Sequence, residues 1–264
     1  MSFDPAAAAD ALLAARRDRR VAGPLPDGLA PRDAGEAAAV QVALAGRTGA
    51  LPLGGFKIGA TGSRMQAFLG IDHPCAGFMA ARDIYPSGVM LPHAAFRLPQ
   101  IECELAVRLA SDLPPGPCTM EQAAASVGTL FAAIEIVENR YGPPPVGDVA
   151  AVGLPTMIAD QFYHAAAVIG APPADWRRLD LPALEGRAIV DGTQRNAGKG
   201  ADLLGHPLRG LAWLAASPVA AAFGGLKAGQ VVLLGSVIPS ITLPEPCAVR
   251  IEFDDLPAVE LRFV

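Results

Sequence analysis

The segment QIECELAVRL at 100–109 alternates strictly between two kinds of side chain. Successive side chains of a β-strand point to opposite faces of the sheet, so the pattern predicts a strand here. One face would carry Ile101, Cys103, Leu105 and Val107, and the other Glu102, Glu104, Ala106 and Arg108. The chain must therefore build a sheet, and that sheet has two neighbouring carboxylates on one face.

Further apolar or alternating runs predict that strands dominate after residue 55. The predicted strands are FKIGA at 56–60 and the segments 132–138, 186–191, 230–235, 247–253 and 258–264. The last two flank a DDLP connection and predict an antiparallel hairpin. Because a regular alternation of strand and helix is absent, the pattern indicates an α+β fold.

Helical spacing is clearest near the start of the chain, over 5–20 and 33–46. The Pro/Gly-rich LPLGG at 51–55 follows, so we expect a helical region over 1–54 and a larger domain over 55–264. Three shorter helices are predicted farther on. The first begins with a capping box at Ser63–Gln66 and ends near Gly70. The second begins with a capping box at Thr119–Gln122 and ends near Ala132, and the third begins at Pro207.

Composition limits the classes of partner. The 264 residues carry a formal net charge of −5 and few aromatic side chains, which argues against nucleic acid. No apolar run approaches the roughly 18 residues of a membrane span, so we expect a soluble protein with no membrane partner. The first residues lack the pattern of a signal peptide, and the four cysteines are scattered, which favours reduced thiols and a cytoplasmic location.

The carboxylates on the 100–109 strand are the first candidates for chemistry. Glu102 and Glu104 form half of a site for a hard cation such as Mg²⁺ or Mn²⁺. The alternative is a solvated strand face. Glu135 lies inside the apolar run AAIEIV, where a carboxylate should be paired, protonated or metal-bound, with a buried ion pair as the alternative. Glu138 ends that run, and we expect it to be exposed.

Other polar residues give weaker signals. Lys57 stands among the glycines of GFKIG, where its ammonium group could reach an anionic substrate. GTQRNAGKG at 192–200 does not match a phosphate-binding loop. His164 and His206 have no ligand spacing and are typical of structural histidines, and Ser236 lacks the G-x-S-x-G pattern of hydrolases.

Taken in order, five segments resemble the 2-oxopent-4-enoate hydratase family of the fumarylacetoacetate hydrolase-like superfamily, which includes 4-oxalocrotonate decarboxylase. The segments are GFKIGATGSRMQAFLGID, IECELAVRLASDL, AIEIVENR, HPLRGLAWLA and LKAGQVVLLGS. The likeness covers nearly the whole chain. It implies an α+β fold with a mixed β-roll behind an N-terminal helical region.

The resemblance also implies a site. Glu102, Glu104 and Glu135 would be the ligands of Mg²⁺ or Mn²⁺, Lys57 would stand in the active site, and Ser236 would lie where the substrate carboxylate binds. Two segments depart from the family. GFMAARD has Ala80, Ala81 and Arg82 where members carry acidic residues. An acid/base group is therefore either missing from this segment or supplied by Asp83. ADQFYHAAAVIG keeps Asp160 but has the bulky Phe162, Tyr163 and His164.

The activity implied by the resemblance is metal-dependent hydration of a small 2-hydroxy-dienoic or 2-oxo-enoic acid, with water added at C4. The general base stays open among Asp83, Asp160 and His164, and Arg82 or Arg64 would suit a diacid substrate. A 4-oxalocrotonate-type decarboxylase or a carbon–carbon hydrolase is the alternative within this chemistry. A non-catalytic partner subunit is the alternative of another class. Expected partners are the oxo acid, further copies of the chain and a related pathway enzyme.

Overall fold

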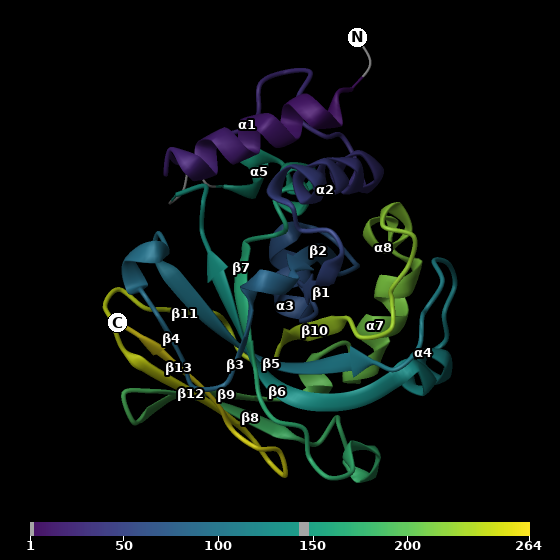
Figure 1. Ribbon diagram of the computed structural model, residues 1–264, viewed down its shortest axis with the longest axis vertical. Coiled ribbons are helices and arrows are strands. Elements are labelled where there is room, and N and C mark those ends of the chain that lie inside the picture. Colours follow the sequence, from purple (N-terminus) through teal and green to yellow (C-terminus); the bar gives the residue numbers. More distant parts are fainter. Residues whose placement is uncertain (1–2, 143–147) are drawn as a thin grey trace.

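A computed structural model describes residues 3–142 and 148–264 of the chain. It shows helices and two mixed sheets, which confirms the α+β class (Figure 1). The larger sheet has eight strands. They are β1 (Leu53–Gly59), β2 (Cys75–Ala80), β3 (Ile84–Pro86), β5 (Pro99–Leu109), β6 (Val127–Glu138), β7 (His164–Ile169), β10 (Val231–Ser236) and β11 (Ile241–Thr242).

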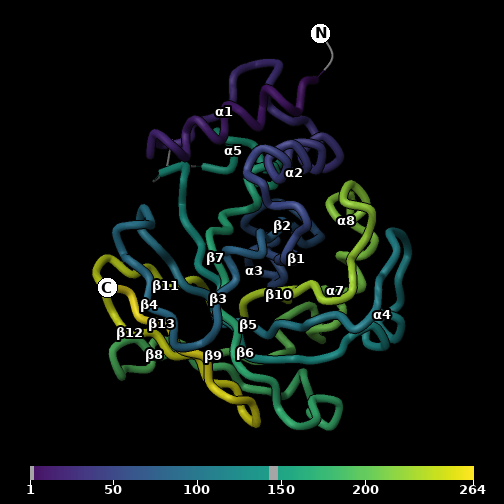
Figure 2. Tube along the Cα trace, in the orientation of Figure 1, coloured from purple at the N-terminus to yellow at the C-terminus, as the bar shows by residue number. Residues whose placement is uncertain are grey.

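The spatial order of the larger sheet is β2-β1-β10-β5-β6-β7-β3, and β11 pairs with β5. The two longest strands, β5 and β6, run antiparallel at its centre and curve strongly (Figure 2). The pairing places residues of five strands on one face of the sheet, because side chains of directly paired residues share a face. That face carries a small apolar group made of Met79, Ala106, Phe131, Ala133, Ala167, Val231 and Leu233.

The smaller sheet has the order β4-β13-β12-β8-β9. Its strands are β4 (Val89–Leu91), β8 (Glu185–Val190), β9 (Thr193–Lys199), β12 (Ala248–Phe253) and β13 (Val259–Phe263). β12 and β13 pair antiparallel, which confirms the predicted hairpin. This sheet packs against the face of β5 and β6 that carries Ile101, Cys103 and Leu105, where the main hydrophobic core lies.

Helices cover the rest of the larger sheet (Figure 1). They are α1 (Pro5–Arg17), α2 (Ala34–Thr48), α3 (Ser63–Leu69), α4 (Met120–Ser126), α5 (Val149–Val152), α6 (Leu154–Ala159), α7 (Pro207–Ala216) and α8 (Pro218–Ala222). Asp4 and Asp33 cap α1 and α2, since their side chains accept backbone N–H groups. Buried Gln41 on α2 donates to the carbonyls of Ala76 and Ile158, which fixes α2 to the body. The division at residue 54 stays a prediction.

Two expectations about local structure were wrong, and several strands were missed. α3 has Gly62 at its N-cap with no side-chain cap, and Gln66 donates to the Ala60 carbonyl, so no capping box forms at Ser63. The capping box at Thr119–Gln122 is present, but α4 ends at Ser126 and β6 starts there rather than near residue 132. The alanines at 123–125 do lie in α4, whereas VGTLF at 127–131 contains a glycine together with β-branched and aromatic residues, which favour a strand. β2, β3, β4, β7, β9 and β11 were not predicted.

Within the described ranges, no helix is both long and apolar enough to cross a membrane.

Candidate active site

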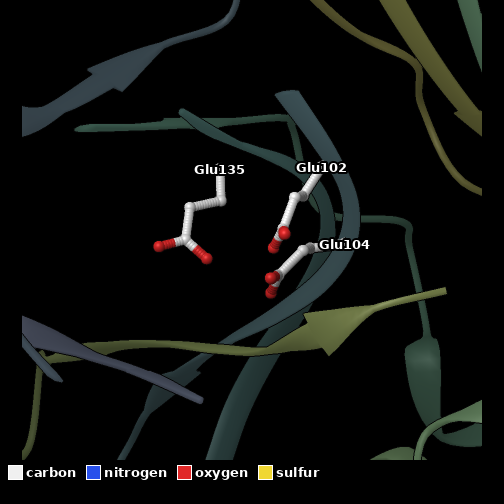
Figure 3. A group of neighbouring side chains, drawn as sticks. All are labelled: Glu102, Glu104 and Glu135. Carbon is white, nitrogen blue, oxygen red and sulfur yellow. The ribbon is translucent and has the colours of Figure 1, made fainter. Parts of the chain in front are cut away.

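The pairing of β5 with β6 gathers three carboxylates. Glu102 pairs with Glu135 and Glu104 with Ala133, so the three glutamates share one sheet face. One carboxylate oxygen from each lies within 4.8 Å of the other two. Figure 3 shows Glu102 and Glu104 projecting in parallel from the curved strand toward the carboxylate of Glu135. The chain therefore places three acidic groups around one point.

These carboxylates are not solvated. Glu104 and Glu135 are fully buried and Glu102 is partly buried, so the exposed strand face considered for this pair is wrong. The Gly235 N–H donates to Glu104 Oε2 at 2.9 Å. A Cβ on Gly235 would lie 2.2 Å from Thr61 Oγ1, which excludes a larger residue there. Among the described residues, Glu104 Oε1 and Glu135 Oε2 have no hydrogen-bond partner.

Two nitrogen donors converge on the other oxygen of Glu135. Lys57 Nζ lies 3.3 Å from Oε1, and His164 Nδ1 lies 2.8 Å from the same atom. Both side chains are buried, so Lys57 is not a surface lysine. The Phe162 ring lies beside the ammonium group, 5.0 Å from Nζ to the ring centroid, and Gly59 leaves room for both. Glu135 thus has a buried ion pair in addition to its place in the acidic group.

Burial and mutual repulsion shift the proton affinities in this group. Burial, reinforced by the charge of Glu135, raises the pKa of Glu102 to about 7. Burial and the charges of Glu135 and Glu102 hold the pKa of Glu104 well above its usual range. Burial alone would raise the pKa of Glu135, but Lys57 and His164 outweigh it and lower that pKa. One buried lysine cannot neutralise three carboxylates, so protons or a cation must complete the balance.

The donor set fits a divalent cation with a preference for oxygen. Three carboxylates from two rigid strands, two of them with an unpartnered buried oxygen in the described structure, form half of an octahedral shell. Such a cation would leave positions open for water and a chelating ligand. No thiol takes part, which favours Mg²⁺ or Mn²⁺ over softer metals.

The raised pKa values predict pH-dependent metal binding. A cation must displace the protons held by Glu102 and Glu104, whose pKa values lie above the ordinary range, so lowering the pH strengthens the competing protons. We expect the apparent affinity for Mn²⁺ to rise by about tenfold or more between pH 5.5 and 7.5, where Glu102 loses its proton. Calorimetry in buffers of different ionisation enthalpy measures both the affinity and the protons released. A flat affinity with no proton release would contradict these shifts.

Asp160, one of the candidate bases, is hydrogen-bonded to residues outside the group of three carboxylates. Its carboxylate accepts from Arg16 Nε at 2.8 Å, from Arg140 Nη1 at 3.3 Å and from the Tyr141 hydroxyl at 3.2 Å. Asp160 itself is buried. Asp160 therefore joins α1 to the end of β6, and this structural network occupies the carboxylate oxygens that a base would need.

Replacing this carboxylate should cost stability rather than metal binding. We expect Asp160→Asn to lower the free energy of unfolding by about 3–5 kcal/mol, because it leaves the guanidinium groups of Arg16 and Arg140 without their buried counter-charge. Affinity for Mn²⁺ should stay within a fewfold of the parent value. Chemical denaturation and metal titration of the same variant measure the two effects. Lost Mn²⁺ binding in a fully folded variant would place Asp160 in the site.

The remaining predicted residues are less closely placed. Asp83 follows β2, is partly exposed, and lies within electrostatic range of His164; burial raises its pKa. Arg82 is exposed and donates to the Gly49 carbonyl, and Arg64 is exposed on α3. The Ser236 hydroxyl donates to the Ile238 carbonyl at 2.7 Å and accepts from the Cys103 N–H at 3.2 Å. Within the described residues, no hydrogen bond or ion pair joins these four side chains to the three carboxylates, although Ser236 on β10 pairs directly with Glu104 on β5.

Two site residues were missed as participants. Phe162 contacts Lys57, and Arg140 donates to the His164 carbonyl. Phe162 stood out in the sequence only as a bulky residue in an unusual segment. Arg140 gave no signal, because its burial depends on Asp160, twenty residues later in the chain.

Comparison with known proteins gives a consistent result. The chain is 32% identical over 209 residues to 2-keto-4-pentenoate hydratase of Burkholderia vietnamiensis, covering 79% of this chain and 77% of that protein. It is 31% identical to 2-keto-4-pentenoate hydratase 1 of Dechloromonas aromatica, covering 97% and 96%. The structure of 4-oxalocrotonate decarboxylase from Pseudomonas putida G7 superposes with a TM-score of 0.87 at 23% identity, covering 98% and 97%. This confirms the expected fold. No family model matches the chain.

Proposed function

Since the chain belongs to the 2-keto-4-pentenoate (2-oxopent-4-enoate) hydratase family, we propose that it is a divalent-metal-dependent hydratase. Its substrate would be a small 2-hydroxy-dienoic or 2-oxo-enoic acid, and its product a 4-hydroxy-2-oxo acid. The observation that carries the proposal is the convergence of three carboxylates on one point, with Lys57 beside them. The Pseudomonas putida decarboxylase structure contains magnesium and adipate, which supports a divalent cation here.

The residues of the chain suit this chemistry. Glu102, Glu104 and Glu135 would hold Mg²⁺ or Mn²⁺, which when bound supplies Lewis-acid polarisation of a carboxylate and its adjacent keto oxygen. Lys57 places a buried ammonium group where negative charge develops on the substrate. The apolar group beside the carboxylates, which includes the fully buried Ala106 and Ala133, keeps water away from one side of the site. A 2-hydroxy-dienoic acid first ketonises, losing its enol O–H proton and gaining a proton at C5. Water then adds across the C3–C4 double bond: one O–H bond of water and the π bond break, and a C–O bond at C4 and a C–H bond at C3 form.

Turnover with identified products tests the proposal. Purified protein with Mn²⁺ or Mg²⁺ should convert 2-hydroxypenta-2,4-dienoate to 4-hydroxy-2-oxopentanoate and consume one water. Oxalate, a planar chelating dianion, should inhibit competitively and only with metal present. Carbon dioxide release from 4-oxalocrotonate without hydration would favour the decarboxylase alternative. The chain superposes on the structure of such a decarboxylase from Pseudomonas putida, so this alternative is tested too. Absence of both turnover and metal binding would point to the partner-subunit alternative.

The proposal extends to a cytoplasmic homo-oligomer that can associate with a related pathway enzyme. All four cysteines are free thiols, which supports a reducing compartment. Light scattering on the purified chain measures the assembly.

A further inference from the structure

The backbone just before β7 is held in an unusual conformation. Gln161, Phe162 and Tyr163 have φ values of 63°, 46° and 69°, so three consecutive non-glycine residues are left-handed. Each such residue costs roughly 1–2 kcal/mol relative to a right-handed one. The turn is held by the Gln161 side chain, which donates to the Phe78 carbonyl at 2.8 Å, and by Arg140, which donates to the His164 carbonyl. Strain maintained by surrounding contacts is typical of functional segments.

A β-bulge directly after this turn sets the direction of His164. On β6, Ile136 pairs with Ala166 and Val137 with His164, so Ala165 is the extra residue on β7. Without the bulge, strand alternation would point His164 away from the face that carries Glu135. With it, His164 lies opposite Val137 and therefore on the same face as Glu135. The turn and the bulge together aim the imidazole at the acidic group.

The imidazole fixes the orientation of the Glu135 carboxylate. His164 Nδ1 and Lys57 Nζ both lie against Oε1, at 2.8 Å and 3.3 Å. Two donors on one oxygen restrict rotation of the carboxylate, and they leave Oε2 with no partner among the residues that the structure describes. Oε2 is therefore the atom presented to a cation.

The other end of the imidazole is also unsatisfied. His164 is 3% exposed, and Nε2 has no hydrogen-bond partner in the described parts of the chain. With Nδ1–H donating to a carboxylate, Nε2 of the neutral ring carries a lone pair. A buried acceptor requires a donor, which a water or a hydroxyl group supplies and a keto or carboxylate oxygen does not.

We infer that His164 is a positioning residue with two roles in the site. Through Nδ1 it holds Glu135 so that Oε2 faces the cation. Through Nε2 it accepts a hydrogen bond from the water molecule that adds to the substrate, or from the hydroxyl group of the substrate. The second role rests on the proposed function, whereas the first concerns metal binding alone. Outer-shell partners of this kind commonly change metal affinity by about 10–100-fold.

Two substitutions separate the roles. His164→Asn keeps an amide N–H near Nδ1 and lacks the distant acceptor, whereas His164→Leu lacks both. In calorimetric titration of metal-stripped protein with Mn²⁺, we expect the Leu variant to bind about 10–100-fold more weakly and the Asn variant to bind within threefold of the parent. In turnover, the Asn variant should lose tenfold or more in kcat with little change in KM. His206→Asn, which keeps a side-chain cap on α7, is the matched control and should behave as the parent.

The outcomes are distinguishable. Parent protein that binds no Mn²⁺ would overturn the proposed function itself. If the parent binds Mn²⁺ and the Leu variant binds it equally well, His164 does not position Glu135. An Asn variant with the parent kcat overturns the role of Nε2. Should circular dichroism show the Leu variant to be unfolded, His164→Ser, which also lacks both ring nitrogens, replaces it in the same comparison.

Discussion

Glu102→Gln and Glu135→Gln should each weaken Mn²⁺ binding by two orders of magnitude or more and abolish turnover. Each substitution removes one buried carboxylate charge while keeping the shape of the side chain, and losing a buried counter-charge costs about 3–5 kcal/mol. Without metal, Glu102→Gln should have the opposite effect, on stability. The substitution relieves the repulsion that raises the pKa of Glu104, so the metal-free variant should melt at a higher temperature than the metal-free parent.

The control for these two substitutions is Glu138→Gln, on the same strand as Glu135. Glu138 is paired with Arg140 and lies outside the acidic group, so Mn²⁺ affinity should stay near the parent value. Calorimetry and thermal unfolding of the three variants, with and without Mn²⁺, provide the test. If Glu102→Gln and Glu135→Gln bind Mn²⁺ as tightly as the parent does, these glutamates do not form the metal site.

Lys57→Met should lower kcat by about 10²–10³-fold, the usual cost of removing a group that stabilises developing charge. Metal affinity should be unchanged or higher, because the three carboxylates lose their only lysine within the described structure and become a more negative site, while His164 still holds Oε1 of Glu135. The metal-free variant should be less stable by about 3 kcal/mol, since Glu135 loses a buried partner. Added Mn²⁺ should restore much of that stability.

Lys227→Met serves as the matched control for Lys57→Met. Lys227 is exposed and pairs with Asp112, so its removal should leave turnover, metal binding and stability close to the parent values. Steady-state kinetics and Mn²⁺ titration separate the two lysines. A Lys57→Met protein with full activity would exclude Lys57 from the reaction, and one that no longer binds Mn²⁺ would show that its part is structural.

Local patterns predicted the acidic group because its signals are local. The alternation through Glu102 and Glu104, and the apolar run around Glu135, each lie within one strand. Their meeting follows from antiparallel pairing of β5 and β6, which no local pattern fixes; the resemblance implied only that the three glutamates bind one ion. Lys57 was identified in the same way, from the glycines on either side of it.

The surroundings of the acidic group could not be predicted, since they depend on distant contacts. His164 looked isolated because its partner Glu135 lies on another strand, and the bulge at Ala165 that aims it leaves no pattern in the sequence. β7 itself was missed because the alanines in HAAAVI have a weak strand preference. Asp160 was proposed as a base from resemblance, whereas the two arginines that occupy it come from α1 and the end of β6.

Anomalous diffraction from crystals of the protein grown with Mn²⁺ tests the central claim most directly. We predict one strong manganese peak per chain, about 2 Å from oxygens of Glu102, Glu104 and Glu135, with Oε2 rather than Oε1 of Glu135 as the ligand. A peak at any other set of residues, or no peak at a Mn²⁺ concentration that supports turnover, would contradict the assignment of these three carboxylates as the metal centre.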